Sequence, residues 1–208
     1  ADYYQTQRYL QALALKLGLI VNFRDSHLKP KRVLNSEIEN SQNSREFVDS
    51  HRSGWEDIYH LVILPMYKEP YAVIKESFES LARSNYPKEN MFVVLAVEES
   101  AGAEAQDTAR EVEKNFKDKF GAFLITTHPL GLRGEMPGKG SNESWAAKEA
   151  KNILLDKKGI SPENVLVSSF DVDTQVYEEY FGRLTYLFLN TKDNLRAIYQ
   201  PIPFFNNN

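Results

Sequence analysis

"YHLVILPMY", residues 59–67, is an almost unbroken run of apolar side chains in a chain of 208 residues. A strand with one face in water alternates apolar and polar side chains, whereas a strand covered on both faces is apolar throughout. We therefore predict a strand buried on both faces here. Three further segments are predicted as strands, namely "MFVVLAVE" at 91–98, "AFLITTH" at 122–128 and "NVLVSSFD" at 164–171.

Helix-like segments separate these strands. They carry apolar side chains at helical spacing, and Pro70 suits the first turn of the earliest one. Their expected ranges are 71–84, 104–120, 142–158 and 180–190, with a last strand at 196–205. Strands that alternate with helices across short links imply an α/β fold with a doubly wound, mostly parallel sheet.

The first 56 residues have a different character. We expect a helix that ends at Gly18, then a short strand and a basic segment, at 3–18, 19–23 and 28–35. The residues that follow are rich in Ser, Asn and Glu, which is the composition of a linker. The predicted division is a small N-terminal αβ appendage, a polar linker and a main domain, at 1–35, 36–56 and 57–208.

The composition disfavours several classes of protein. The net charge is −4, so a broad basic stripe for nucleic acid is not expected. Cysteine is absent, which excludes disulfides and thiolate metal sites and fits a reducing, cytoplasmic compartment. No apolar run approaches the roughly 18–20 residues that span a bilayer.

Polar side chains follow each of the four predicted strands. The carboxyl ends of parallel strands meet at one edge of a sheet, where ligands bind in such folds. We therefore expect a functional edge there. Its candidate residues, taken in strand order, are Pro65, Tyr67 and Glu69, then Glu98 and Glu99, then Lys139 and Asn142, and finally Asp171 and Asp173.

Asp171 and Asp173 are the candidates for a metal site. Residues two apart on an extended chain point to the same side, and two hard oxygen ligands suit Mg²⁺ or Mn²⁺. The alternative is that they form only the polar cap of a buried strand. Lys139 lies in a glycine-rich loop before a helix, and such a loop attracts phosphate. The alternative is that this loop is only a flexible turn with a Ser or Asn cap on the helix. For Glu98 and Glu99, the alternative to a binding role is that both are solvated carboxylates in a loop. For Glu69, the alternative is that it only favours the start of a helix.

Residues 58–208 resemble family 2 glycosyltransferases of the GT-A fold. The segments that carry the resemblance are "LVILPMYKEP", "SNYPKENMFVVLAVEES", "GKGSNESWAAK", "VSSFDVDTQV" and "QPIPFFNN". In this family the Asp-x-Asp motif binds a divalent ion that bridges the diphosphate of a nucleotide sugar, and Asp171 and Asp173 match it. The resemblance further assigns the nucleotide base to Glu98 or Glu99. It assigns the remaining nucleotide-sugar contacts to Pro65, Tyr67, Glu69, Lys139 and Asn142.

The resemblance implies sugar transfer with inversion from a nucleotide sugar to the hydroxyl of a glycan or lipid-linked acceptor. This chain departs from the family by having Glu where Asp is usual after the second strand. The family's general base would lie beyond Asn208, as would helices that associate with the membrane. We therefore expect a donor-binding half without transferase activity of its own, in the cytoplasm or at the cytoplasmic face of a membrane in a longer protein.

Residues 1–52 are similar to the C-terminal tail of the small PD-(D/E)-x-K nuclease-like proteins called GxxExxY. The catalytic residues of such proteins lie upstream of that tail, so no nuclease activity is expected from this segment. Two alternatives to a transferase remain open at this point. One is a module that binds a nucleotide or metal without turnover, and the other is a nucleic-acid-associated protein acting through these residues.

Overall fold

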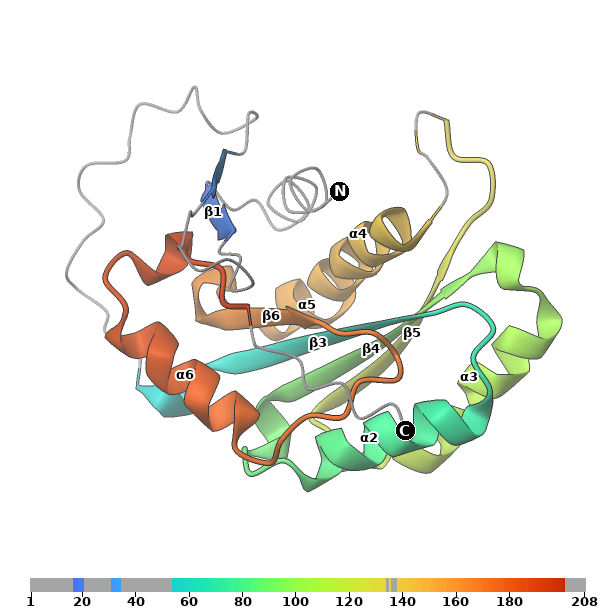
Figure 1. Ribbon diagram of the computed structural model, residues 1–208, viewed down its shortest axis with the longest axis horizontal. Helices are drawn as coiled ribbons and strands as arrows, with labels where there is room; N and C mark the ends of the chain where they lie inside the picture. The colour runs from blue at the N-terminus through green and yellow to red at the C-terminus, as the bar shows by residue number, and fades with distance from the viewer. Residues whose placement is uncertain (1–16, 21–30, 35–53, 134, 136–137, 201–208) are drawn as a thin grey trace, which may run out of the picture. The chain divides into compact units, whose positions relative to one another are not determined.

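The computed structural model describes residues 17–20, 31–34, 54–133, 135 and 138–200. The contacts divide the chain into two compact units, one of residues 51–189 and one of residues 1–50 with 190–208. The first unit contains a four-stranded sheet (Figure 1). Within the described residues, no helix has the length and apolar character needed to cross a membrane.

A four-stranded parallel sheet forms the centre of the larger unit (Figure 1). Its strands run in the order β5-β4-β3-β6, and each neighbouring pair is parallel. Their bounds are β3 at Tyr59–Met66, β4 at Met91–Glu98, β5 at Ala122–His128 and β6 at Val165–Ser169. The α/β class and the parallel sheet predicted from the sequence are therefore confirmed.

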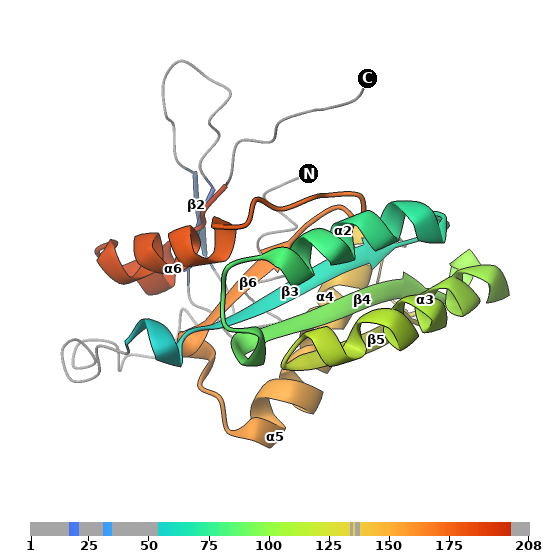
Figure 2. The same cartoon turned by 90° about the horizontal axis from the view of Figure 1, so that it is seen from below.

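Helices cover both faces of this sheet, which explains why its central strands are almost entirely apolar. Figures 1 and 2 show α2 and α3 on one face and α4 on the other. On the first face, Val62 and Leu64 of β3 pack with Phe78 of α2 in one core cluster. The helices span Tyr71–Arg83 for α2, Ala103–Phe116 for α3, Lys139–Ala150 for α4, Asp156–Lys158 for α5 and Tyr180–Asn190 for α6.

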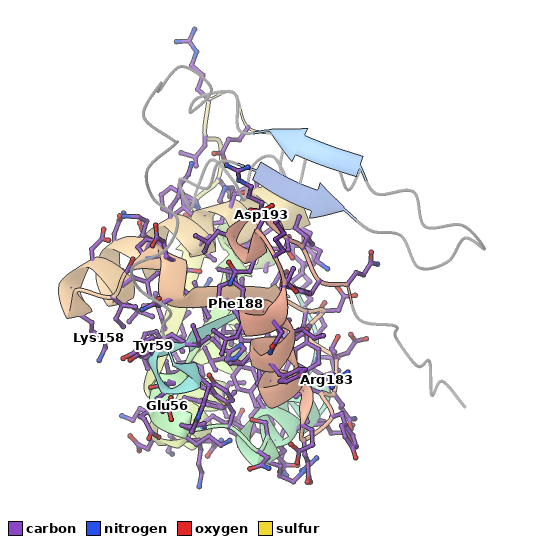
Figure 3. All side chains as sticks on the ribbon, turned by 90° about the vertical axis from the view of Figure 1, so that its left-hand side faces the viewer. Glu56, Tyr59, Lys158, Arg183, Phe188 and Asp193 are labelled. Carbon is purple, nitrogen blue, oxygen red and sulfur yellow. The ribbon has the colours of Figure 1, made fainter. Side chains whose placement is uncertain are left out.

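The α6 helix packs on the same side as α2. Its Phe181 is fully buried in the core cluster, and Phe188 is buried in the last turn of the helix. Figure 3 shows this side of the unit, where α6 carries both Phe188 and the exposed Arg183. The periodic apolar pattern at 180–190 thus predicted the helix correctly.

Several predicted elements differ from the structure by more than one residue. The helix predicted at 104–120 ends as α3 at Phe116, and the strand predicted at 164–171 spans only Val165–Ser169 as β6. The helix predicted at 142–158 begins three residues earlier, at Lys139, and passes through a π-helical turn at Lys151–Leu155. The strand predicted at 196–205 is wrong over 196–200, because Arg196 ends a 3₁₀ turn and 197–200 has no regular structure, and 201–205 lies outside the described residues. Pro201 and Pro203 have no backbone N–H, so this segment has fewer donors with which to join a sheet.

The smaller unit contains a hairpin-like pair of short strands. β1 at Leu17–Ile20 runs antiparallel to β2 at Lys31–Leu34. Gly18 therefore lies in a strand and does not end a helix as predicted; the rest of that predicted helix, 3–16, lies outside the described residues. The basic segment was not predicted as a strand because two of its four strand residues are charged, whereas pairing uses only the backbone. Of the predicted linker, 36–53 lies outside the described residues, and Trp55–Asp57 form a 3₁₀ turn.

A close backbone contact at Gly121, just before β5, leads to a first prediction. Its N–H donates to the carbonyl oxygens of Lys88 and Met91, at 2.6 and 3.0 Å. A Cβ atom at this position would overlap the backbone carbonyl of Glu89. Overpacking of this kind costs about 1–3 kcal/mol, so Gly121→Ala should lower the free energy of unfolding measured with urea by that amount.

Gly182 in α6 provides the matched control. A Cβ atom there would meet its nearest neighbour, the carbonyl oxygen of Asn85, at 3.9 Å, which is ordinary contact. Alanine is a better helix former than glycine by about 0.5–1 kcal/mol, so Gly182→Ala should raise the free energy of unfolding. Equal urea midpoints for the two variants would show that the packing at Gly121 is looser than described.

Candidate functional site

A cavity of about 300 Å³ opens at the carboxyl ends of β3, β4 and β6. Its wall contains eight of the nine residues predicted from the sequence, drawn from segments more than 100 positions apart. These eight are Pro65, Tyr67, Glu69, Glu98, Lys139, Asn142, Asp171 and Asp173. The structure therefore brings the strand-end residues together at one edge of the sheet, although their roles stay predictions.

Glu99 is the predicted residue that the cavity does not include. Its Oε2 atom accepts a hydrogen bond from the backbone N–H of Leu130, at 2.8 Å. This contact ties the end of β4 to the loop that follows β5. Glu98, which is the last residue of β4, lines the cavity, and its Oε2 accepts a hydrogen bond from the Ser100 hydroxyl at 2.9 Å. The two adjacent acids thus have different positions, and Glu98 is the one available to a ligand.

The turn after β3 forms one wall of the cavity. The backbone N–H of Tyr67 donates to Oε2 of Glu69 at 2.7 Å, so this carboxylate folds back onto its own turn. The Tyr67 side chain is 44% exposed, and the Lys68 ammonium lies 5.2 Å from the centre of its ring. Pro70 then precedes the first residue of α2. Glu69 therefore shapes the turn that presents the aromatic ring to the cavity.

The start of α4 forms a second wall. Gly138 precedes the helix at φ +143°, a conformation that glycine adopts far more readily than other residues. Asn142 is buried, and its Nδ2 donates to the carbonyl oxygen of Ala96 in β4 at 2.8 Å. Its Oδ1 atom is buried without a hydrogen-bond partner in the described part of the chain. Asn142 thus fixes the first turn of α4, and with it Lys139, against the end of β4.

The segment after β6 supplies the two aspartates. The side chains of Asp171 and Asp173 are exposed and line the cavity, while Val172 between them is buried in the core. A turn closes here, because the N–H of Thr174 donates to the carbonyl oxygen of Asp171 at 2.9 Å. The Lys139 ammonium forms an ion pair and a hydrogen bond with Oδ1 of Asp171. The buried valine therefore anchors a short acidic loop whose two carboxylates face the cavity.

Glu143 is a polar residue of this region that no motif in the sequence singles out. It is fully buried on the first turns of α4, and the Ser169 hydroxyl donates to its Oε1 at 2.6 Å. The same Oε1 atom lies 3.9 Å from the Lys139 ammonium. The spacing of four residues between Lys139 and Glu143 was the signal available in the sequence, because such residues are neighbours on a helix.

The cavity wall is strongly acidic. Among the described residues, it contains four carboxyl side chains, from Glu69, Glu98, Asp171 and Asp173, and one lysine. No group of three or more His, Asp or Glu side chains is arranged to hold a metal ion within the described residues. Two exposed carboxylates still fit Mg²⁺ or Mn²⁺, since such ions keep several waters and take phosphate oxygens from the ligand. They do not fit a zinc site, which takes at least three protein ligands.

The fold is similar to crystal structures of TarS from S. aureus. The structure of TarS 1–349 in complex with UDP-GlcNAc matches with 20% sequence identity and a TM-score of 0.39, over 63% of this chain and 31% of that one. A second structure of TarS 1–349 matches with 22% identity over 32% of its length. A structure of TarS matches with 23% identity over 19% of its length.

This chain therefore spans about a third or less of the length of these TarS structures. The likeness concerns the fold alone. No protein-family model matches the chain, and no curated protein matches it.

Proposed function

We propose that the cavity binds the diphosphate of a nucleotide sugar together with Mg²⁺ or Mn²⁺, as the donor site of a sugar transferase. The observation that carries the proposal is the meeting of Asp171, Asp173, Lys139 and Glu98 on one cavity wall at the carboxyl edge of a parallel sheet. This edge is where ligands bind in such folds.

The acidity of the wall is the reason to propose a metal ion. Four carboxyl groups beside a single lysine would repel a diphosphate, whereas a divalent cation on Asp171 and Asp173 would reverse the local charge. When bound, the ion would stabilise the negative charge that develops on the departing diphosphate. Lys139 would add a second positive charge next to the phosphate oxygens.

The nucleoside would lie between the first two strand ends. Tyr67 offers an exposed aromatic ring there, and Glu98 offers a carboxylate that accepts hydrogen bonds from a base or a ribose. The backbone bond from Tyr67 to Glu69 holds this turn in place before the ligand arrives. Asn142 would contribute chiefly by fixing the start of α4, because its amide nitrogen already donates to β4.

The proposed reaction joins the sugar to an acceptor hydroxyl, which needs a general base to remove its proton. The proposal for the described residues is donor binding, and it is tested by binding and not by turnover.

Calorimetry with UDP and with GDP, each with and without Mn²⁺, tests this proposal. We expect at least one of them to bind in the presence of Mn²⁺, and binding to weaken by about tenfold or more without the ion, because the acidic wall then repels the diphosphate. Uridine and guanosine, which have no diphosphate, are the controls and should show no dependence on Mn²⁺. Absence of UDP and GDP binding under both conditions would overturn the proposal, and equal affinity under both would exclude the metal.

A further inference from the structure

Lys139 lies between two carboxyl groups that differ in their surroundings. One is Asp171, whose side chain is 68% exposed, and the other is Glu143, whose side chain is fully buried. The Lys139 side chain is itself 49% exposed, so its ammonium is at the boundary between the cavity and the protein interior. A chain of polar contacts thus runs from Ser169 through Glu143 to Lys139 and on to Asp171.

The buried carboxyl group has a cost that its contacts must offset. A carboxyl group removed from water is unfavourable unless hydrogen bonds or an opposite charge compensate it. Glu143 has such compensation from the Ser169 hydroxyl at 2.6 Å and from the Lys139 ammonium at 3.9 Å. The rigid partner in this pair is Glu143, because it is packed inside the protein, whereas lysine has a long and flexible side chain.

A metal ion bound to Asp171 and Asp173 would displace the Lys139 ammonium from Asp171. The ammonium and a divalent cation both need Asp171, and they repel each other, so the lysine has to leave this carboxylate when the ion binds. A lysine freed in this way at the protein surface would sample many rotamers. Glu143 lies on the same helix one turn further on and does not line the cavity, so it remains beside the lysine.

We propose that Glu143 is a positioning residue, which holds the Lys139 ammonium at the cavity wall when Asp171 turns to the metal ion, so that the lysine meets a phosphate group of the ligand. The inference rests on the proposed function of the cavity. Ser169, at the end of β6, fixes the carboxyl group of Glu143 and is the second positioning residue. Neither residue touches the ligand.

Glu143→Gln separates this role from a simple effect of charge. Removal of a negative group near an anion site would by itself strengthen diphosphate binding, because it removes repulsion. Loss of positioning would instead weaken it, by about tenfold, which is typical when a supporting residue behind a binding group is changed. The affinity for UDP in saturating Mn²⁺, measured by calorimetry, therefore changes in opposite directions under the two explanations.

A double-mutant cycle with Lys139→Gln completes the test. If Glu143 acts through the lysine, Glu143→Gln should lower the affinity for Mn²⁺–UDP in the wild-type background and have no further effect in the Lys139→Gln background. Uridine affinity should stay unchanged in all variants, which controls for a general disturbance of the cavity. Tighter UDP binding by Glu143→Gln, or equal losses in both backgrounds, would overturn the inference.

Ser169→Ala keeps the test decisive if Glu143→Gln does not fold. This variant leaves the carboxyl group in place and removes its hydrogen bond, so we expect a smaller loss of UDP affinity, about threefold, that again disappears in the Lys139→Gln background. An unchanged affinity would overturn the inference. Failure of wild-type protein to bind UDP and GDP would instead overturn the proposed function, so the two failures are distinguishable.

Discussion

Acidification from pH 7 to pH 4 will lower the free energy of unfolding of this protein by about 3 kcal/mol through His60 alone. This histidine lies in β3 and is fully buried. Its Nε2 atom is 2.9 Å from the Thr185 hydroxyl of α6, and its ring meets the rings of Tyr86 and Phe181 edge-on. Its Nδ1 atom has no hydrogen-bond partner among the described residues.

Burial determines the direction of the effect. It lowers the pKa of His60 from 6.5 to about 3, because the charged imidazolium would lose its hydration. The unfolded chain binds a proton near pH 6.5, whereas the folded chain does not until about pH 3. The contribution of His60 to the free energy of unfolding is therefore complete above pH 6.5. It is lost at about 1.4 kcal/mol per pH unit as the pH falls from 6.5 toward 3.

Urea unfolding at several pH values, for wild type and His60→Gln, measures this term. Glutamine does not titrate and retains polar atoms toward Thr185, so this variant should be less stable at pH 7 but lose less stability on acidification. His128→Gln is the control and should keep the steep dependence, since it leaves His60 in place. A wild-type curve parallel to that of His60→Gln would show that His60 is accessible to protons in the folded state.

Asp173→Asn should weaken the Mn²⁺-dependent binding of UDP or GDP by about 100-fold or more. The change keeps the shape of the side chain but removes the charge that a divalent ion needs, and loss of even a supporting group typically costs about 10–100-fold in metal affinity. Asp173 is exposed at the cavity and shows no ion pair or hydrogen bond within the described residues, whereas Asp171 is paired with Lys139. It is therefore the carboxylate that is more available to the ion.

Asp107→Asn on α3 is the matched control for this prediction. Asp107 is an exposed aspartate paired with Arg110, and it does not line the cavity. Its substitution should change UDP affinity by less than about twofold. The folded state should be little affected by either variant, because exposed polar substitutions usually alter the free energy of unfolding by about 0.5 kcal/mol or less. Equal affinities for Asp173→Asn and wild type would exclude Asp173 as a metal ligand.

The sequence was most informative where one physical rule determines the outcome. A run such as 59–67 has few alternatives to a buried strand, and parallel strands necessarily bring their carboxyl ends to one edge. The gathering of Tyr67, Lys139 and Asp171 around one cavity follows from these two rules. Closeness in the sequence does not explain it, since the three residues lie in the segments that follow three different strands.

Other features depend on the position of a single residue or on tertiary packing, which local patterns do not contain. Glu98 and Glu99 were equivalent in the sequence, but β4 ends at Glu98, and the next side chain points to the loop after β5. Glu143 resembled an ordinary helix-surface acid, and its burial depends on how α4 packs beside Ser169. In the smaller unit, β2 contains Lys31 and Arg32. These charged residues do not indicate a strand in the sequence, although β2 pairs with β1 through its backbone.

Paramagnetic broadening by Mn²⁺ is the measurement that tests the central claim most directly. Trace Mn²⁺ added to the ¹⁵N-labelled protein with UDP should broaden the amide signals nearest the ion selectively. We expect these to be the signals of the turn after β3, the first turn of α4 and the loop after β6, at 67–69, 139–142 and 171–174. Broadening confined to other acidic segments such as α3, or absent from the cavity residues at concentrations where UDP binds, would contradict a metal–diphosphate site at this edge of the sheet.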